Sequence, residues 1–265
     1  MSPINTPSPT PTPPPKTKTK TKTKKNPNWK SQSKATLSPP ALYRQIRALH
    51  TPATITVYQA YPESIALPAL AAQSFANIPA FKMSRMTWIK PSFLWMAYRS
   101  GYGTKRGQER VLAVEISRAG FEWAVARGVL AHLPSTTTTT TRSSRSSSTA
   151  ASDPAGGGQA GTQDRLAQWR ANLEASCVRV QWDPERDLFG NPLPYRSLQV
   201  GLRGEAVERY VSEWTVGIRD VTGLMHEIKG LVDEGDLEGA RGLVPTEAIY
   251  DLPTEIRRGV GMVEA

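Results

Sequence analysis

The sequence is poor in the residues that build disulfides and metal centres. It contains one cysteine, Cys177, and three histidines among 265 residues. A single cysteine excludes an intrachain disulfide and favours a reducing compartment, so we expect a cytoplasmic or nuclear protein. Because no Cys-x-x-Cys or His-x-x-x-His spacing occurs, we also expect no zinc or other metal site.

Long apolar segments and several catalytic motifs are also missing. No run approaches the roughly 20 apolar residues that span a bilayer, so we expect no membrane partner. The first residues lack the apolar segment of a secretory signal. Neither a G-x-S-x-G elbow nor a Walker-type phosphate loop is present, which leaves the hydrolases and nucleotidases built on those motifs without support.

Acidic residues are absent from residues 1–40, which hold eight lysines. The formal net charge is +10, but beyond residue 40 the chain has 25 basic and 23 acidic residues. The basicity therefore belongs to the N-terminal segment, whose Pro/Thr/Lys-rich composition predicts a disordered tail. We favour a solubilising role for this tail over loose nucleic-acid binding, nuclear import or phosphorylation, although its lysines are the main candidate contacts for nucleic acid.

A second segment of low complexity interrupts the chain at residues 134–163. It contains six consecutive threonines, a Ser/Arg mixture and three consecutive glycines. Such a composition cannot bury a core, so we predict a disordered surface insertion. The remaining residues between 41 and 250 predict a single domain, followed by a short C-terminal extension over residues 251–265.

Hydrophobic periodicity within this domain predicts an α+β fold. The expected strands are Thr54–Tyr61, Arg110–Ile116, Val178–Asp183, Arg196–Leu202 and Trp214–Val221. The expected helices follow Pro62 with an interruption at Pro68, cover Ser92–Ser100, run from Ser117 to Leu130, and recur at Asp164–Asn172, Gly204–Val211 and around Leu224–Val232. Connections after the third strand are too short for crossover helices. We therefore predict a mixed, partly antiparallel sheet of about five strands.

The stretch Arg85–Glu109 combines two Trp, two Tyr, five basic residues and three Gly. Pro91 suits the first turn of a helix, and Gly101 is a natural stop. Because the helix is apolar on most sides, we expect it to be buried. Backbone N–H groups of the following Gly101–Gly107 loop, together with the nearby cations, predict an anion site. The competing interpretation is that these tryptophans are core, the glycines form turns and the cations form a solvated rim.

The candidate ligand-binding residues are aromatic, basic or polar residues from this stretch and from the first strand. They are Tyr58, Tyr61, Arg85, Trp88, Lys90, Ser92, Tyr98, Arg99, Lys105 and Gln108. Glu109 is the candidate catalytic residue, because a carboxylate beside cations is held ionised. Another carboxylate group, Asp183, Glu185 and Asp187, fits a solvated turn with Arg186 better than a metal or acid–base site.

Several motifs resemble those of a known family in the same order. They are VYQAY (57–61), MTWIKPSFLWM followed by YRSG (86–101), GQERVLAV (107–114), VQWDPERD (180–187) and LQVGLRGEAVERYV (198–211). On these motifs the chain is identified as a member of DUF4291, a domain of unknown function shared by bacteria and filamentous fungi. The resemblance spans most of residues 41–250 and implies no particular reaction.

A fainter resemblance concerns the ADP-ribosyltransferases. A strand with Val-Tyr-Gln-Ala, an aromatic segment bearing Ser, and a strand-borne Gln-Glu are similar to their three-part pattern. This resemblance implies NAD as the cofactor and Glu109 as the residue that polarises its ribose. The chain departs from the pattern because the first strand has no Arg or His and three strands follow Glu109.

Three functions follow as hypotheses. The first is an enzyme that binds a nucleotide or another anionic small molecule between Arg85 and Glu109. The second is a nucleic-acid-binding module in which the same aromatic and basic residues stack bases. The third is a non-catalytic protein-interaction domain.

Overall fold

The computed structural model describes residues 43–132 and 157–262. The expected tail at residues 1–40 and most of the expected insertion at residues 134–163 lie outside the described residues. The helix expected from Asp164 already begins at Gly157, so its first turns occupy the last part of the segment predicted as an insertion.

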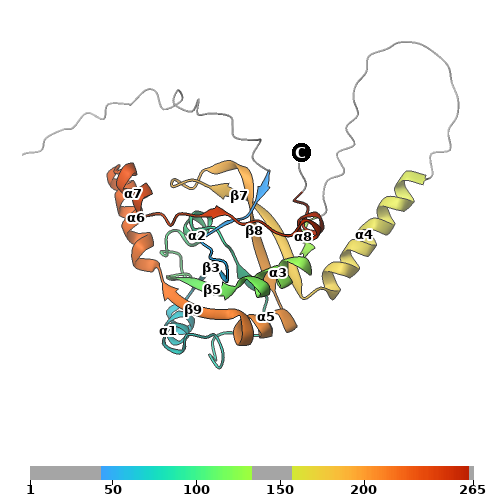
Figure 1. The fold of residues 1–265 in the computed structure, drawn as a ribbon, viewed down its shortest axis with the longest axis horizontal. Coiled ribbons are helices and arrows are strands. Elements are labelled where there is room, and N and C mark those ends of the chain that lie inside the picture. Colours follow the sequence, from blue (N-terminus) through green and yellow to red (C-terminus); the bar gives the residue numbers. More distant parts are fainter. Residues whose placement is uncertain (1–42, 133–156, 263–265) are drawn as a thin grey trace, which may run out of the picture. The chain divides into compact units, whose positions relative to one another are not determined.

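Two sheets dominate the β-structure (Figure 1). The first is antiparallel, in the order β3 (Thr54–Tyr61), β5 (Arg110–Ser117), β9 (Thr215–Asp220). The second has five strands, in the order β1 (Arg44–Gln45), β8 (Pro192–Leu202), β7 (Val178–Arg186), β6 (Val129–Leu130), with β4 (Thr87–Ile89) also paired to β8. A small pair joins β2 (Arg47–Ala48) to β10 (Ala248–Ile249).

Among the described residues, an isolated backbone bridge connects the two larger sheets. The Tyr58 N–H donates to the Lys90 carbonyl at 2.7 Å, and the Lys90 N–H donates to the Tyr58 carbonyl at 3.3 Å. Tyr58 belongs to β3, and Lys90 directly follows β4. The chain thereby curls from one sheet into the other at Lys90.

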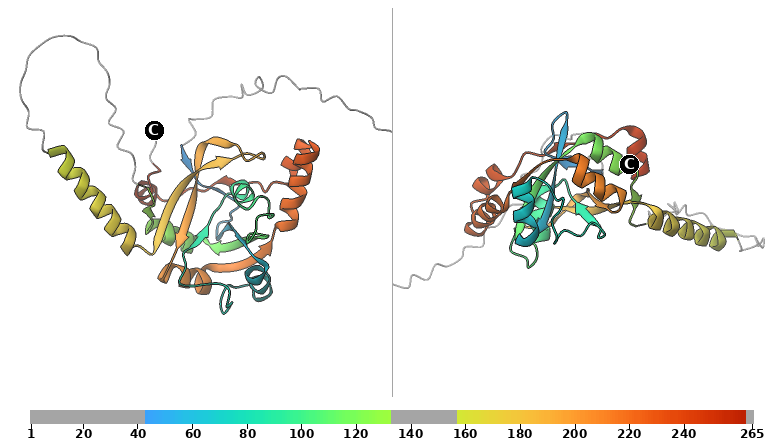
Figure 2. Two further views of the ribbon diagram at one scale, coloured as in Figure 1. Left: turned by 180° about the vertical axis from the view of Figure 1, so that it is seen from behind. Right: turned by 90° about the horizontal axis from the view of Figure 1, so that it is seen from below.

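Helices flank the two sheets. They are α1 (Glu63–Ala72), α2 (Phe93–Ser100), α3 (Arg118–Ala126), α4 (Gly157–Ala175), α5 (Glu205–Arg209) continued by the π-helix η1 (Tyr210–Trp214), α6 (Thr222–Glu234), α7 (Leu237–Leu243) and α8 (Thr254–Gly259). Figure 2 shows from two further directions that α6 and α7 lie side by side. No helix in the described part of the chain has both the length and the apolar character needed to cross a membrane.

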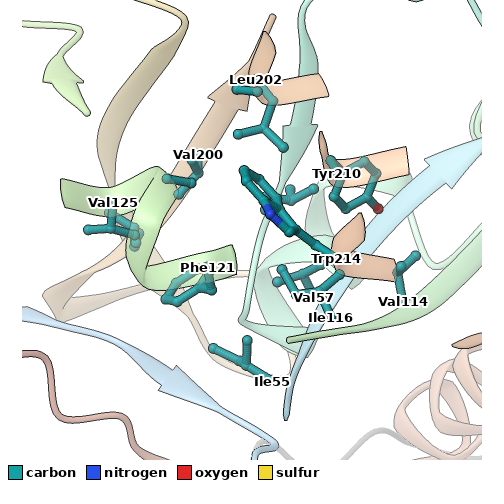
Figure 3. Packing of buried hydrophobic residues seen from close by; sticks show 14 of the residues in the cluster. Ile55, Val57, Val114, Ile116, Phe121, Val125, Val200, Leu202, Tyr210 and Trp214 are labelled. Carbon is teal, nitrogen blue, oxygen red and sulfur yellow. The ribbon is translucent and has the colours of Figure 1, made fainter. Parts of the chain in front are cut away.

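The main core lies where both sheets meet α3 and η1. Alternating residues of β3 and β5, such as Ile55 and Val114, are fully buried there. Figure 3 shows them converging with Phe121 of α3 and Val200 of β8 around Trp214. The intervening residues Tyr58, Val111 and Ala113 belong to a second buried cluster. Because successive side chains of a strand point to opposite faces, β3 and β5 are buried on both faces.

The α+β class and the mixed sheet of about five strands are confirmed. Their membership differs from expectation, because the five predicted strands divide between two sheets and short strands complete the larger one. The helix predicted to reach Leu130 ends at Ala126. There Gly128 lies so close to Val180 that an added Cβ would come within 2.3 Å of its side chain, and the chain turns to pair Val129 and Leu130 with β7.

Three other boundaries also differ from expectation. Pro68 does not interrupt α1; it lies on an exposed face, where water can reach the carbonyl that loses its N–H partner. The segment predicted as a turn after Asp183 continues as strand to Arg186, with a register shift. The helix expected to end at Val211 continues as η1 and buries Tyr210 and Trp214.

Contact between α3 and Trp214 gives a stability prediction. A Cβ added to Gly120 would lie 2.3 Å from the Trp214 ring. Gly120→Ala is therefore expected to destabilise the fold by about 1–3 kcal/mol, as overpacking does, measured by denaturant unfolding. Gly230→Ala in α6 is the matched control, because no atom lies within 4 Å of its added Cβ. The control should gain up to about 1 kcal/mol, and equal effects of the two changes would contradict the close contact.

Candidate functional site

A cavity of about 660 Å³ lies beside the junction of the two sheets. Its walls come from the end of β3, the start of α1, the segment leading into β4, helix α2 and strand β8. The residues that line it are Gln59–Pro62, Ser64, Ile65, Ala80–Lys82, Arg85–Lys90, Trp95, Met96, Arg99, Gly107, Gln108 and Gln199. This volume is within the range of pockets that hold small molecules.

The charge of this lining is one-sided. Four of the residues are basic: Lys82, Arg85, Lys90 and Arg99. None of the described residues that line the cavity is Asp or Glu. Lys82, Arg85 and Arg99 are exposed, whereas only 1% of Lys90 is exposed. The cavity therefore has one buried cation in its wall and three cations that solvent also reaches.

Lys90 is held by three neighbours. Its Nζ lies 3.1 Å from Asp183 Oδ2 and donates to the Ser197 carbonyl at 3.4 Å. It also lies 3.9 Å from the centre of the Trp95 ring, a distance typical of a cation–π contact. The other oxygen of Asp183 accepts a hydrogen bond from Gln181 at 2.8 Å. Lys90 thus joins both strands of the β7–β8 hairpin to helix α2.

Burial lowers the pKa of Lys90 to about 8, although the nearby Asp183 and Glu185 carboxylates act in the opposite direction. Removal of a lysine from water disfavours its charged form, and an adjacent carboxylate favours it. The amine of Lys90 is therefore closer to its neutral form than an ordinary lysine at neutral pH.

Helix α2 is fixed at both ends, which places Trp95, Met96 and Arg99 at the cavity. The Ser92 hydroxyl caps the helix by accepting from the Trp95 N–H at 3.2 Å, and it donates to Glu185 at 2.8 Å. Because Ser92 is the N-cap, Pro91 precedes the helix and is not part of its first turn. Gly101 ends the helix with φ +58°, a left-handed conformation that favours glycine.

Six of the predicted site residues line this cavity. They are Tyr61, Arg85, Trp88, Lys90, Arg99 and Gln108. The side chains of Arg99 and Gln108 contact each other, with a nitrogen-to-oxygen distance of 3.4 Å. The indole of Trp88 lies against β8, where a Cβ added to Gly201 would be 3.0 Å from the ring.

Five predicted residues do not line the cavity: Tyr58, Ser92, Tyr98, Lys105 and Glu109. Tyr58 is buried against Phe93, with ring centres 5.4 Å apart. Tyr98 is exposed and carries the Arg186 guanidinium 4.0 Å above its ring. Lys105 donates to the Arg99 carbonyl. Ser92 is occupied in capping, as described above.

The Glu109 side chain hydrogen-bonds to the loop that precedes it. Its carboxylate accepts from the Gly107 N–H at 2.7 Å, and this hydrogen bond, with a smaller contribution from Arg106, lowers the pKa of Glu109. The loop also differs from the predicted anion site, because most of its N–H groups donate within the protein. Those of Gly101, Tyr102, Gly103, Thr104, Lys105, Gly107 and Gln108 all have protein acceptors. The cations and not the loop amides therefore give the cavity its charge.

Several lining residues were not predicted from the sequence. Gln59 is 2% exposed; it donates to the Trp88 carbonyl at 3.0 Å and accepts from the Tyr210 hydroxyl at 2.6 Å. A glutamine among the β-branched and aromatic residues of this strand was the signal that could have identified it. Lys82, Trp95 and Gln199 carry no comparable local signal.

The carboxylates after the third predicted strand also differ from expectation. Asp183 and Glu185 are not in a solvated turn, since Asp183 pairs with Lys90 and Glu185 is 3% exposed. Glu185 is buried because β7 extends past it and packs against α2. Asp187 does lie in a turn, where it accepts from the Phe189 and Asn191 N–H groups. Among the described residues, no group of three or more His, Cys, Asp or Glu side chains is arranged to hold a metal ion.

Comparison with known proteins identifies one family. The model of a family described as "Domain of unknown function (DUF4291)" matches residues 45–250. No curated protein and no solved structure matches the chain.

The Lys90–Asp183 pair gives a pH-dependent prediction. Asp183→Asn leaves a buried ammonium without its carboxylate, so we expect a loss of about 3 kcal/mol at pH 6. The loss should be smaller at pH 9, because the pKa of Lys90 is about 8 and its amine is then mostly neutral. Denaturant unfolding at both pH values measures it. Asp233→Asn is the control, since the Lys229–Asp233 pair is exposed and should contribute less than about 1 kcal/mol.

Glu247 gives a second pH-dependent prediction, in which the stability of the native chain falls as the pH rises. It accepts from the Phe93 N–H at 2.6 Å, and burial raises its pKa to about 8 from 4.5. The folded state therefore retains a proton that the unfolded state releases, and stability falls as the pH rises from about 5 to 8. Glu247→Gln retains the acceptor and removes this titration, so its stability relative to the native chain should increase by more than about 1 kcal/mol over this range. If the free energies of unfolding of the native chain and of Glu247→Gln run parallel when plotted against pH, the raised pKa of Glu247 is contradicted.

Proposed function

The chain belongs to the DUF4291 family, whose name specifies no activity, and from the geometry of the cavity we propose that it binds a nucleotide or another phosphate-bearing small molecule. The observation that carries this proposal is the lining of four basic and no acidic residues among those described. Cations that surround a low-dielectric cavity reinforce one another and attract anions.

The exposed cations are available to a ligand. Arg85 is exposed and forms no ion pair with any described carboxylate. Within the described residues, the Arg99 guanidinium hydrogen-bonds only to the neutral side chain of Gln108. Arginine presents a planar fork of donors that matches two phosphate oxygens. These two side chains are therefore the proposed phosphate contacts, with Lys90 as a fixed charge behind them.

Aromatic and amide groups on the same walls suit the remainder of a nucleotide. Trp88 and Tyr61 are partly buried and line the cavity, so each offers ring surface for a base. Gln108 and Gln199 add amide donors and acceptors. A pocket with apolar walls and a few placed polar groups is the usual form of a small-molecule site.

NAD and ADP-ribose belong to this ligand class, and ADP-ribosyl transfer is the enzymatic form of the proposal. Glu109 lies outside the lining, so the geometry supports binding and assigns no transfer step to this carboxylate. Small molecules are favoured over nucleic acid because the cations converge on one cavity. A protein-interaction role is the alternative that remains if no ligand binds.

Calorimetric titration with ATP, NAD, ADP-ribose and inorganic phosphate tests the proposal, with adenosine as the uncharged comparison. We expect a phosphate-bearing ligand to bind and adenosine to bind at least about tenfold more weakly, because each charge-assisted contact contributes about 1.5–3 kcal/mol. Arg85→Gln and Arg99→Gln should each weaken binding about tenfold or more.

The matched control is Arg106→Gln, an exposed arginine of the neighbouring loop that does not line the cavity. It should leave the affinity unchanged. The proposal is wrong if none of the ligands binds, or if the two cavity arginines and Arg106 prove equivalent. Oligonucleotide binding that survives both cavity changes would instead support the nucleic-acid alternative.

A further inference from the structure

Lys90 differs from every other lysine in the described part of the chain. Lys82 and Lys105 are exposed and the Lys229 side chain is 42% exposed, whereas Lys90 is 1% exposed and still belongs to the cavity lining. A buried ammonium is expensive to maintain. The bridge to Tyr58 uses only the backbone of Lys90, so it does not require an amine at this position.

The surroundings of Lys90 combine burial, which favours the neutral amine, with a group that is placed to take its proton. Asp183 Oδ2, 3.1 Å away, favours the ammonium by its charge and can also accept a proton from Nζ. The Trp95 ring, 3.9 Å away, shields Nζ from water on one side. With a pKa of about 8, roughly one molecule in ten carries the neutral, nucleophilic amine at pH 7. Desolvated lysines of this kind react with carbonyl compounds.

We propose that Lys90 forms a reversible imine with an aldehyde or ketone that also carries a phosphate or carboxylate group. This proposal rests on the proposed function, because Arg85 and Arg99 would hold the anionic group while the carbonyl carbon reaches Nζ. Open-chain sugar phosphates represent the ligand class. The inference adds a covalent step and a reactive residue to the binding site.

The step balances without any further reactant. The Lys90 ammonium gives one proton to Asp183, and the neutral amine attacks the carbonyl carbon to form a carbinolamine. Return of the proton expels the former carbonyl oxygen as water. One ammonium and one carbonyl compound thus give one iminium ion and one water molecule. Because the iminium retains the positive charge, the attraction to Asp183 is preserved in the product.

The experiment uses pyridoxal 5′-phosphate as a phosphate-bearing aldehyde and pyridoxal as the same aldehyde without phosphate. Each is incubated at a limiting concentration with the full chain, trapped with cyanoborohydride, and located by peptide mass spectrometry. We expect pyridoxal 5′-phosphate to modify Lys90 at least about tenfold more than Lys82, Lys105 or Lys229. Pyridoxal should show no such preference, and inorganic phosphate should protect Lys90.

Two variants show whether the cavity directs the reaction. Arg99→Gln should lower the modification of Lys90 by pyridoxal 5′-phosphate about tenfold while leaving its reaction with pyridoxal unchanged. Arg106→Gln should change neither reaction. Both substitutions lie on exposed side chains, so the fold is expected to tolerate them.

The outcomes separate this inference from the proposed function. If Lys90 stays unmodified while calorimetry still shows Arg99-dependent binding of phosphate compounds, the reactive amine is refuted and the anion site stands. If Lys90 is unmodified and nothing binds, both fail. Equal modification of Lys90 and the exposed lysines would also overturn the proposal, because accessibility and not the site would then govern the reaction.

Discussion

Lys90 connects both larger sheets and helix α2. Its backbone makes the bridge between β3 and the residue that follows β4, and its side chain reaches Asp183 on β7 and Ser197 on β8. The same side chain lies over Trp95 of α2. A charge can remain in such a place only if its partners satisfy it, so the positions of β7, β8 and α2 are mutually constrained by one ammonium group.

This constraint also accounts for the electrostatic character of the cavity. Asp183 neutralises Lys90 from the side of the hairpin and does not line the cavity itself. Glu185 is engaged by the Ser92 hydroxyl and the Arg186 N–H. These carboxylates are thus engaged in contacts of the scaffold, and the exposed lining cations Lys82, Arg85 and Arg99 form no ion pair with a described carboxylate. The excess of positive charge in the lining follows from where the carboxylates are used.

Helix α2 forms one wall of the cavity. Its first N–H groups are satisfied by Ser92 and Glu247, and its last turn closes on Gly101. The following loop is tied internally, partly by Glu109. A site on a helix whose ends are both fixed has its side chains placed in advance, which reduces the entropy lost when a ligand binds.

The sequence by itself determined the elements whose signals are local. The strand Thr54–Tyr61 has the predicted bounds, because β-branched and aromatic alternation acts within neighbouring residues. Helix α2 begins after Ser92 and ends at Gly101 for equally local reasons of capping and backbone conformation. The charge distribution predicts a basic tail and a nearly neutral domain, and the stretch Arg85–Glu109 supplies part of the cavity lining.

Only the tertiary structure decided which of those cations is buried and which residues it contacts. Lys90 and Asp183 are 93 positions apart, and Gln199 reaches the cavity from a strand even farther along the chain. The predicted strands divide between two sheets because β4, a segment of three residues, pairs with β8 and turns the chain from one sheet to the other. Pairing of this kind depends on burial shared between distant segments, which no local pattern records.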